Sequence, residues 1–218
     1  MHKVVFHACE NLKNVSASQV EINSHLSFFD GLTSSEIQET LIKSAADLIS
    51  EETPNYQYVA GRLINYHLRK MVYGKFEPPC LCDIVQDNID KGFYDPEFVE
   101  LFTKDEINEL QNFIDHSRDE YLTYAAMEQF RGKYLVQNRA TGEIFETPQV
   151  AYMMIAATLF AKYPADTRMS YIKRYYDAIS RFKISLPTPV MAGVRTPQRQ
   201  FSSCVLIETD DSLDSINA

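Results

Sequence analysis

Apolar residues recur at helical spacing through the first third of the chain. From Ile37 to Ile49 they return at steps of three to five, and Thr33 with Glu36 has the spacing of a capping box. A second helix is expected from Thr53–Pro54 to Gly74, because proline suits the first turn of a helix and glycine its end. The pattern therefore predicts two long helices before residue 75.

The stretch KFEPPC, residues 75–80, interrupts this pattern. Two adjacent prolines remove backbone donors and push the residues before them out of the helical region, so we expect a domain boundary here. Further helices are expected beyond it. They are Leu81 to Asp90 closed by Gly92, a helix that begins with the capping box Thr103–Glu106, and Asp119 to Arg131 ending at Gly132.

The spacing of apolar residues changes from a helical to a strand-like pattern after Gly132. Residues 134–138 and 143–146 read as two short strands around a turn at 140–142, which predicts a β-hairpin. Thr147–Pro148 then opens a helix that is apolar around most of its circumference, so it should be buried, and Pro164 separates it from an amphipathic helix.

Beyond Arg181 the pattern predicts an extended chain punctuated by prolines. The segment 201–208, FSSCVLIE, reads as a strand whose continuous apolar end suits a sheet covered on both faces. Asp211–Ser212 has the character of a helix start. A single strand cannot form a sheet, so this part looks incomplete by itself.

Composition excludes several classes of function. The 218 residues are 45% hydrophobic, which is enough for a packed core, and a net charge of -9 argues against nucleic acid as a partner. No apolar run approaches the roughly 20 residues of a membrane span, and the start lacks the apolar core of a signal peptide, so we expect no membrane association and a cytoplasmic protein. Four irregularly spaced cysteines do not make a disulfide scaffold.

Few residues stand out for their chemistry. Cys204 lies where a loop meets the expected strand; it is either a reactive thiol or a small core residue. Cys80 and Cys82 could form half of a metal site, but no second cluster complements them, so we expect no metal. His67 lies on an apolar helix face, where a packed histidine is the commoner outcome.

The loop before the expected strand contains other candidates. Arg195 and Arg199 could hold phosphate, or could be solvated or paired with acids. Thr188 lies between two prolines, which fix its backbone neighbours. Asp211–Ser212 could be an ordinary helix cap.

Five segments together point to a family. SLPTPVMAGVRTPQRQFSSCVLIE at 185–208 resembles the entry into the first barrel strand of class I ribonucleotide reductase large subunits. The resemblance extends through the other four and so covers essentially the whole chain. They are NYQYVAGRLINYHLRK at 55–70, FEPP at 76–79, KYLVQNRATGEIFETPQ at 133–149 and YIKRYYDAISRFKISLPTP at 171–189.

The resemblance implies a mainly α fold. A helical amino-terminal domain with a short β-hairpin would precede the first strand of a ten-stranded α/β barrel that the chain does not complete. The divisions expected are a truncated ATP-cone-like helical module at 1–74, a helical reductase domain at 75–198, and the first barrel strand with the start of the next helix at 199–218.

The resemblance also implies roles for individual residues. Cys204 would belong to the redox pair that supplies reducing equivalents at the ribose 2′ position, and Thr188 and Ser203 would contact a ribonucleoside diphosphate. The remaining positions would bind nucleoside triphosphates: Asp211, Ser212 and Leu213 at the start of an allosteric effector site, and Ser34 and Lys70 as a remnant of the ATP module.

Such large subunits work with partners. The resemblance implies no cofactor in this chain, a small subunit with a di-iron tyrosyl radical, and thioredoxin or glutaredoxin as reductant. Because most of the barrel is missing, we expect activity only with a complementary carboxy-terminal chain, as in a split subunit. Because the module's first hairpin is missing, we expect neither ATP binding nor inhibition by dATP. The alternatives are a non-catalytic interaction or regulatory module, or an inactive fragment.

Overall fold

Helices make up nearly all of the regular structure. The computed structural model describes residues 2–25 and 27–217. Within these ranges the only β pairing is a single antiparallel bridge between Gln137 and Ile144, so the expectation of a mainly helical chain is confirmed. The elements are α1 His2–Cys9, α2 Ala17–His25, α3 Ser34–Ala46, α4 Tyr56–Tyr73, α5 Leu81–Asp90, α6 Glu97–Leu101, α7 Lys104–Phe113, η1 His116–Tyr121, α8 Tyr124–Gln129, η2 Phe130–Tyr134, α9 Pro148–Phe160, α10 Ala165–Ser180, α11 Thr188–Gly193 and α12 Leu213–Asn217.

Local signals set most helix ends. Thr33 and Thr103 both form complete capping boxes, in which the threonine hydroxyl accepts from the backbone of a glutamate three residues on and that glutamate accepts from the threonine backbone. Gly74 ends α4 in the left-handed conformation, at a φ of 70°. These predictions are confirmed. The helical pattern in the first third of the chain includes α2 but does not give its bounds, and sequence reasoning missed the short helix α6.

The prediction of one continuous helix from Asp119 to Arg131 is wrong. The chain forms the 3₁₀ helix η1, leaves helical geometry at Leu122 and Thr123, and then forms α8. The Thr123 hydroxyl accepts from the backbone of Ala126, which caps a new helix at this point. Gly132 does not end a helix either, because it lies inside the single π-helical turn η2.

The predicted hairpin is reduced to a turn. Gly142 has a φ of 75°, and backbone bonds join Asn138 to Glu143 and Phe145 to Val136. The Val136 amide does not continue the ladder, because it donates instead to the Glu146 carboxylate at 2.7 Å. A side chain therefore takes the place of a partner strand.

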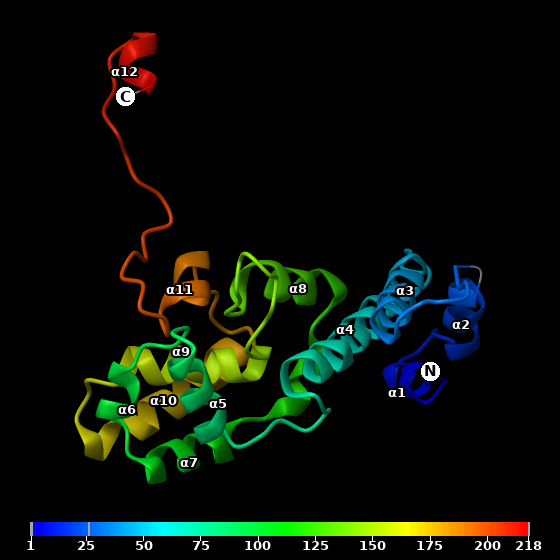
Figure 1. The fold of residues 1–218 in the computed structure, drawn as a ribbon, viewed down its shortest axis with the longest axis horizontal. Helices are drawn as coiled ribbons and strands as arrows, with labels where there is room; N and C mark the ends of the chain where they lie inside the picture. Colours follow the sequence, from blue (N-terminus) through cyan, green and yellow to red (C-terminus); the bar gives the residue numbers. More distant parts are fainter. Residues whose placement is uncertain (1, 26, 218) are drawn as a thin grey trace.

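A single hydrophobic core runs from α1 to the end of α11. The helix α9 is its centre, because nearly every side chain along α9 is buried, as its all-round apolar sequence predicts. In Figure 1, α4 extends from the amino-terminal helices α1 to α3 toward the remaining helices. It packs against α3 on one side and against α8 and η1 on the other. The domain division near residue 75 stays a prediction.

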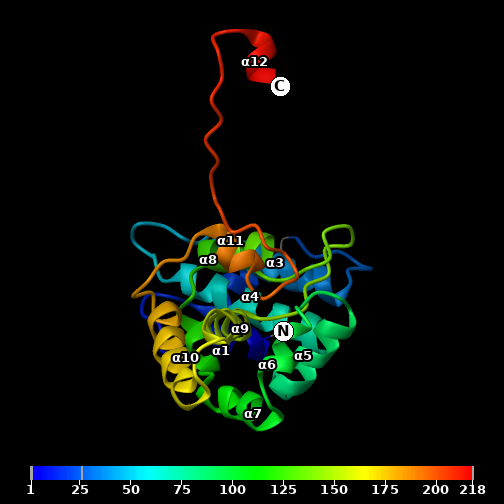
Figure 2. The same ribbon diagram turned by 90° about the vertical axis from the view of Figure 1, so that its left-hand side faces the viewer.

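The carboxy-terminal part differs from the expectation in two ways. Residues 188–193 form the short helix α11 rather than extended chain, which is possible because Pro189 falls in its first turn. Residues 201–208 are extended but are not a strand, since no neighbouring chain in the described ranges offers them a ladder. They project from the helical body and lead to α12, as both views show (Figures 1 and 2).

Within the described residues, no helix combines the length and the apolar character needed to cross a membrane.

Candidate functional site

The projecting segment carries two of the residues that the sequence singled out, Ser203 and Cys204. Ser203 and Cys204 are exposed, and Cys204 is a free thiol. The next three residues are apolar and equally open: Val205 and Ile207 are 69% and 77% exposed, and Leu206 is completely so. The segment therefore presents a free thiol next to an apolar strip that the described part of the chain does not cover.

The base of this segment is held by a buried ion pair. Arg195 and Glu146 are both fully buried, and the Arg195 guanidinium contacts both carboxylate oxygens. The guanidinium also donates to two backbone carbonyls, Nη1 to Met191 at 2.6 Å and Nη2, which binds Glu146 as well, to Tyr134 at 2.9 Å. Arg195 thus joins α11 to the turn that follows η2.

Glu146 is equally well satisfied. Besides Arg195 and the Val136 amide, its carboxylate accepts from the Tyr94 hydroxyl at 2.5 Å. Burial of that phenol, together with the nearby carboxylate, raises the pKa of Tyr94 well above its usual value. Burial alone would lower the pKa of Arg195, but the Glu146 charge outweighs it and the pKa is raised. Arg195 therefore stays charged at any ordinary pH.

This geometry decides between the two interpretations of the arginines. Arg195 is paired with Glu146, and Arg199 forms an ion pair with Asp95, so both are paired with acids rather than open to phosphate. The backbone amide of Asp95 also donates to the Arg195 carbonyl at 3.0 Å. The chain is thereby held on both sides of Pro197. Sequence spacing does not reveal Glu146, because it lies 49 residues away.

Thr188 begins α11 with an exposed side chain. In the described chain no hydrogen bond joins it to Ser203 or Cys204. The connection is indirect, since the Phe201 ring lies near Gly193 at the far end of α11. Thr188 therefore lies at the opposite end of α11 from this contact, while Ser203 and Cys204 lie farther along the projecting segment.

The residues expected at an effector site form an ordinary helix cap. The Ser212 hydroxyl accepts from the Ser215 amide at 3.2 Å, and the Ser212 carbonyl from Ile216 at 3.1 Å. Asp211 and Leu213 are exposed beside it. The helix α12 lies at the outer end of the projecting segment (Figure 2).

Ser34 and Lys70 do meet in one pocket. It has a volume of about 180 Å³ and lies between the start of α3 and the end of α4. His67 also lines it, and its ring nitrogen is 3.3 Å from the Ser35 hydroxyl and 3.6 Å from the Glu39 carboxylate. Burial lowers the pKa of His67, which keeps the ring neutral, as expected for a packed histidine.

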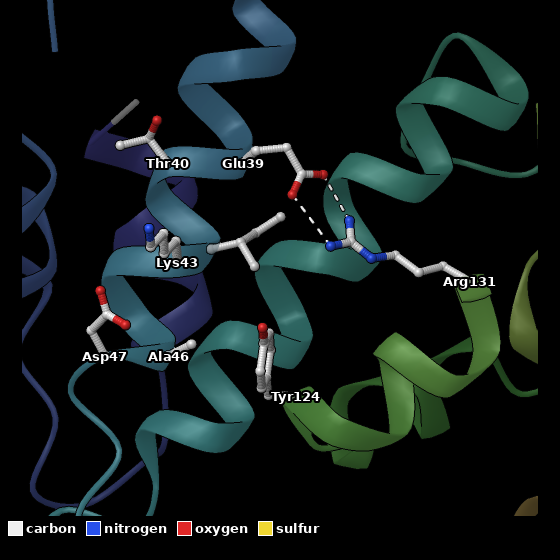
Figure 3. Close-up of a pocket in the computed structure, with 8 residues that line it drawn as sticks. Glu39, Thr40, Lys43, Ala46, Asp47, Tyr124 and Arg131 are labelled. Atoms are coloured by element: carbon white, nitrogen blue, oxygen red, sulfur yellow. Dashed lines mark hydrogen bonds and ion pairs between the residues drawn. The ribbon is translucent and has the colours of Figure 1, made fainter. Parts of the chain in front are cut away.

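A neighbouring pocket of about 460 Å³ lies between α3 and α8 (Figure 3). Arg131 spans it, donating to Glu39 of α3 at 2.7 Å and to Glu128 of α8 at 2.7 Å. Figure 3 shows both dashed bonds from Arg131 to the Glu39 carboxylate. Sequence reasoning missed this contact, because the two residues are 92 positions apart. It ties the start of the π-helical turn η2 to the amino-terminal helices.

Comparison with known proteins agrees with the resemblance. Residues 120–199 match the family model described as the all-alpha domain of ribonucleotide reductase. The chain is 58% identical over its whole length to ribonucleoside-diphosphate reductase 1 subunit alpha of Escherichia coli K12 and 57% identical to subunit alpha of Haemophilus influenzae. It is 49% identical over 188 residues, 86% of the chain, to subunit alpha of phage T4.

Over its whole length the chain is similar to large subunits of ribonucleotide reductase. It spans 29% of the length of the two bacterial relatives and 25% of the phage protein, so it corresponds to an amino-terminal part of such a subunit. In the part of the chain that the structure describes, no three His, Cys, Asp or Glu side chains are grouped in a way that could hold a metal ion.

Proposed function

We propose that this chain forms the amino-terminal part of a ribonucleoside-diphosphate reductase large subunit. It would reduce ribonucleoside diphosphates to deoxyribonucleoside diphosphates together with a second polypeptide that supplies the remaining length. The observation that carries the proposal is the identity of 58% over the whole chain to a reductase alpha subunit. The activity of the whole enzyme is part of the proposal, because the chain spans 29% of that relative.

The projecting segment supports this proposal. Val205, Leu206 and Ile207 are exposed, and covering each of them in a sheet would contribute roughly 1.5 to 3 kcal/mol. Residues 201–208 are already extended, so they could pair with neighbouring strands without refolding. We propose that they become the first strand of the α/β barrel when the rest of the subunit is present.

The residue roles follow from that arrangement. Cys204 would be one thiol of a redox pair: the substrate loses its 2′-hydroxyl as water while Cys204 and a second cysteine, outside this chain, become a disulfide. Thr188 and Ser203 would contact the substrate. Asp211, Ser212 and Leu213 would begin the effector site. The ion pair between Arg195 and Glu146 would fix the position of the segment on which these residues lie.

Other components would complete the enzyme. A small subunit with a di-iron tyrosyl radical would supply the radical, and thioredoxin or glutaredoxin would reduce the disulfide. Ser34 and Lys70 meet in one pocket, as a remnant of an ATP-binding module would.

The proposal can be tested by purifying the tagged chain from its native host. The material would be assayed for ribonucleoside diphosphate reduction, with the small subunit and a thioredoxin system added. We expect a co-purifying polypeptide that carries the rest of the barrel, and turnover that depends on both chains.

Cysteine variants provide the control. Cys204→Ser should abolish turnover, whereas Cys9→Ser, which changes a half-buried thiol of α1, should leave it unchanged. A complex that forms but is insensitive to Cys204→Ser would indicate a non-catalytic interaction module. A chain recovered alone and inactive would indicate a fragment.

A further inference from the structure

Two cysteines far along the chain from Cys204 share one acceptor. Cys80 and Cys82 are free, half-buried thiols at the start of α5. Both point to the side-chain oxygen of Asn108 on the adjacent helix α7: the Cys82 sulfur lies 3.4 Å from it and the Cys80 sulfur 4.0 Å. Asn108 is exposed, so both thiols lie at a surface that small molecules can reach.

Backbone geometry explains why these thiols lie together. Side chains two residues apart inside a helix point to nearly opposite sides. Cys80, however, is the N-cap of α5, with a φ of -56° and a ψ of 140°. This extended ψ turns the Cys80 side chain toward the first helical turn, as an N-cap side chain does when it bonds to the backbone there. It therefore meets Cys82 rather than pointing away from it.

The backbone separation also suits a bond between them. Across a single helical residue such as Leu81 the two Cα atoms are about 5.5 Å apart. Disulfides form over Cα separations of roughly 4.4 to 6.8 Å. We propose that Cys80 and Cys82 form a redox-active vicinal dithiol, which closes to an intramolecular disulfide by exchange with a small disulfide of the glutathione type.

The exchange balances without any other reactant. One thiolate attacks a sulfur of glutathione disulfide, forming a mixed disulfide and releasing one glutathione thiolate. The second protein thiol, once deprotonated, attacks the protein sulfur of that mixed disulfide and releases the other glutathione. The two cysteines lose two electrons and two protons in total, and two glutathione molecules carry them.

Nearby charges set the pH at which the reaction runs. Burial, followed by the neighbouring Cys80 thiol and the Asp83 carboxylate, raises the pKa of Cys82, and Lys104 of α7 partly opposes them. Because the thiolate is the nucleophile, closure should accelerate up to about tenfold per pH unit below this pKa. The dithiol therefore stays reduced longest at low pH and in reducing surroundings.

The other two cysteines do not compete for this bond. Cys9 lies in α1, and burial raises its pKa to about 11, so it reacts slowly. Cys204 is exposed on the projecting segment and could form adducts with glutathione. Replacing both by serine leaves Cys80 and Cys82 as the only thiols of the chain.

The test uses the full chain with Cys9→Ser and Cys204→Ser, incubated with glutathione disulfide at pH 8. Intact mass should fall by two hydrogen atoms, with the closed form at least tenfold more abundant than any glutathione adduct, and dithiothreitol should reverse the change. Peptide mapping should place the bond between Cys80 and Cys82.

Matched variants make the result decisive. With Cys80→Ser or Cys82→Ser added, the remaining thiol cannot close a ring and should retain one glutathione, while the helical circular dichroism stays unchanged. Glutathione adducts on the unaltered pair, or no reaction, would overturn the proposal. The chain by itself suffices for this test, so its outcome does not depend on whether the reductase proposal holds.

Discussion

Two buried ion pairs of this chain differ in how completely their polar atoms are satisfied. Arg195 uses each of its nitrogens on Glu146 or on backbone carbonyls at the base of the projecting segment. Arg69 of α4 binds Asp119 of η1 at 3.2 Å through one nitrogen, while its Nε has no partner in the described structure. The first pair is fully connected, and the second is only partly so.

The partly connected pair lies among buried groups whose pKa values are shifted. Asp119 is completely buried, and burial raises its pKa to about 6 although Arg69 and Gln149 lower it. Next to it, His116 has an unpaired ring nitrogen, and burial followed by the Arg69 charge lowers its pKa to about 4. Arg195 keeps its charge over a wide pH range, whereas the shifted pKa values of Asp119 and His116 make stability depend on pH.

The largest expected effect comes from breaking the connected pair. Arg195→Met leaves the buried Glu146 carboxylate without its cation, and breaking a buried pair in this way costs about 3 to 5 kcal/mol. Urea unfolding should show this loss in the free energy of unfolding. We also expect faster proteolysis between residues 185 and 200.

A double variant separates charge from packing. Arg195→Met combined with Glu146→Gln removes both charges, so it should recover part of the loss. If the single variant were as stable as the parent chain, the Arg195–Glu146 pair would not hold the base of the segment.

Asp119 of the partly connected pair and the neighbouring His116 should affect the pH dependence of stability in opposite directions. A carboxyl whose folded pKa is raised from 3.8 to about 6 destabilises the fold as pH rises through that range, by on the order of 3 kcal/mol. Asp119→Asn should remove this loss. A histidine whose folded pKa is lowered from 6.5 to about 4 does the reverse, so its contribution is lost as pH falls through that range.

Each variant should therefore show the pH dependence of stability that the remaining group causes. With Asp119→Asn, stability should fall more steeply than in the parent chain as pH decreases from 6.5 to 4. With His116→Gln, stability should instead decrease as pH rises from about 4 to 6. Urea titrations at several pH values measure both slopes, and identical slopes in all three proteins would contradict the assignment.

The Arg69–Asp119 pair also depends on how closely α4 approaches η1 and α8. A Cβ at Gly61 would overlap the backbone oxygen of Leu122, which cannot move aside as a flexible side chain could. Gly61→Ala should cost about 1 to 3 kcal/mol and push the helices apart. Gly132→Ala is the control, because a Cβ there meets nothing within 4 Å. Equal stability of the two variants would show that the crossing is not tight.

Sequence patterns predicted the parts of this fold that depend on neighbouring residues. The capping boxes at Thr33 and Thr103, the glycine at the end of α4 and the buried character of α9 all act over a few positions. The cap at Thr123 is also a local signal, but apolar residues continue past it, so the sequence pattern did not reveal that a new helix begins there.

What could not be predicted depends on contacts distant in sequence. The Glu146 carboxylate accepts from the Val136 amide in place of a partner strand, and it also binds Arg195, 49 residues away. The sequence therefore predicted neither the shortening of the hairpin nor the ion pair. The residues of the candidate site came from the resemblance to a family. Their arrangement on a projecting segment, held at its base by Arg195, came from the structure.

The smallest expected effect comes from surface helix caps, whose loss can be compared with the loss of a buried ion pair. Thr33→Ala and Thr103→Ala each remove a capping hydroxyl at the surface, which costs about 1 kcal/mol because one backbone donor of the first helical turn loses its acceptor. Glu106 also binds Arg168 at 2.5 Å, so the second cap keeps a partner for its glutamate and should lose slightly less than the first. Both free energies can be measured by urea unfolding at pH 7. If either variant lost as much free energy of unfolding as Arg195→Met, burial would not determine how much a polar contact contributes to stability. The difference between the two buried ion pairs would then need another cause.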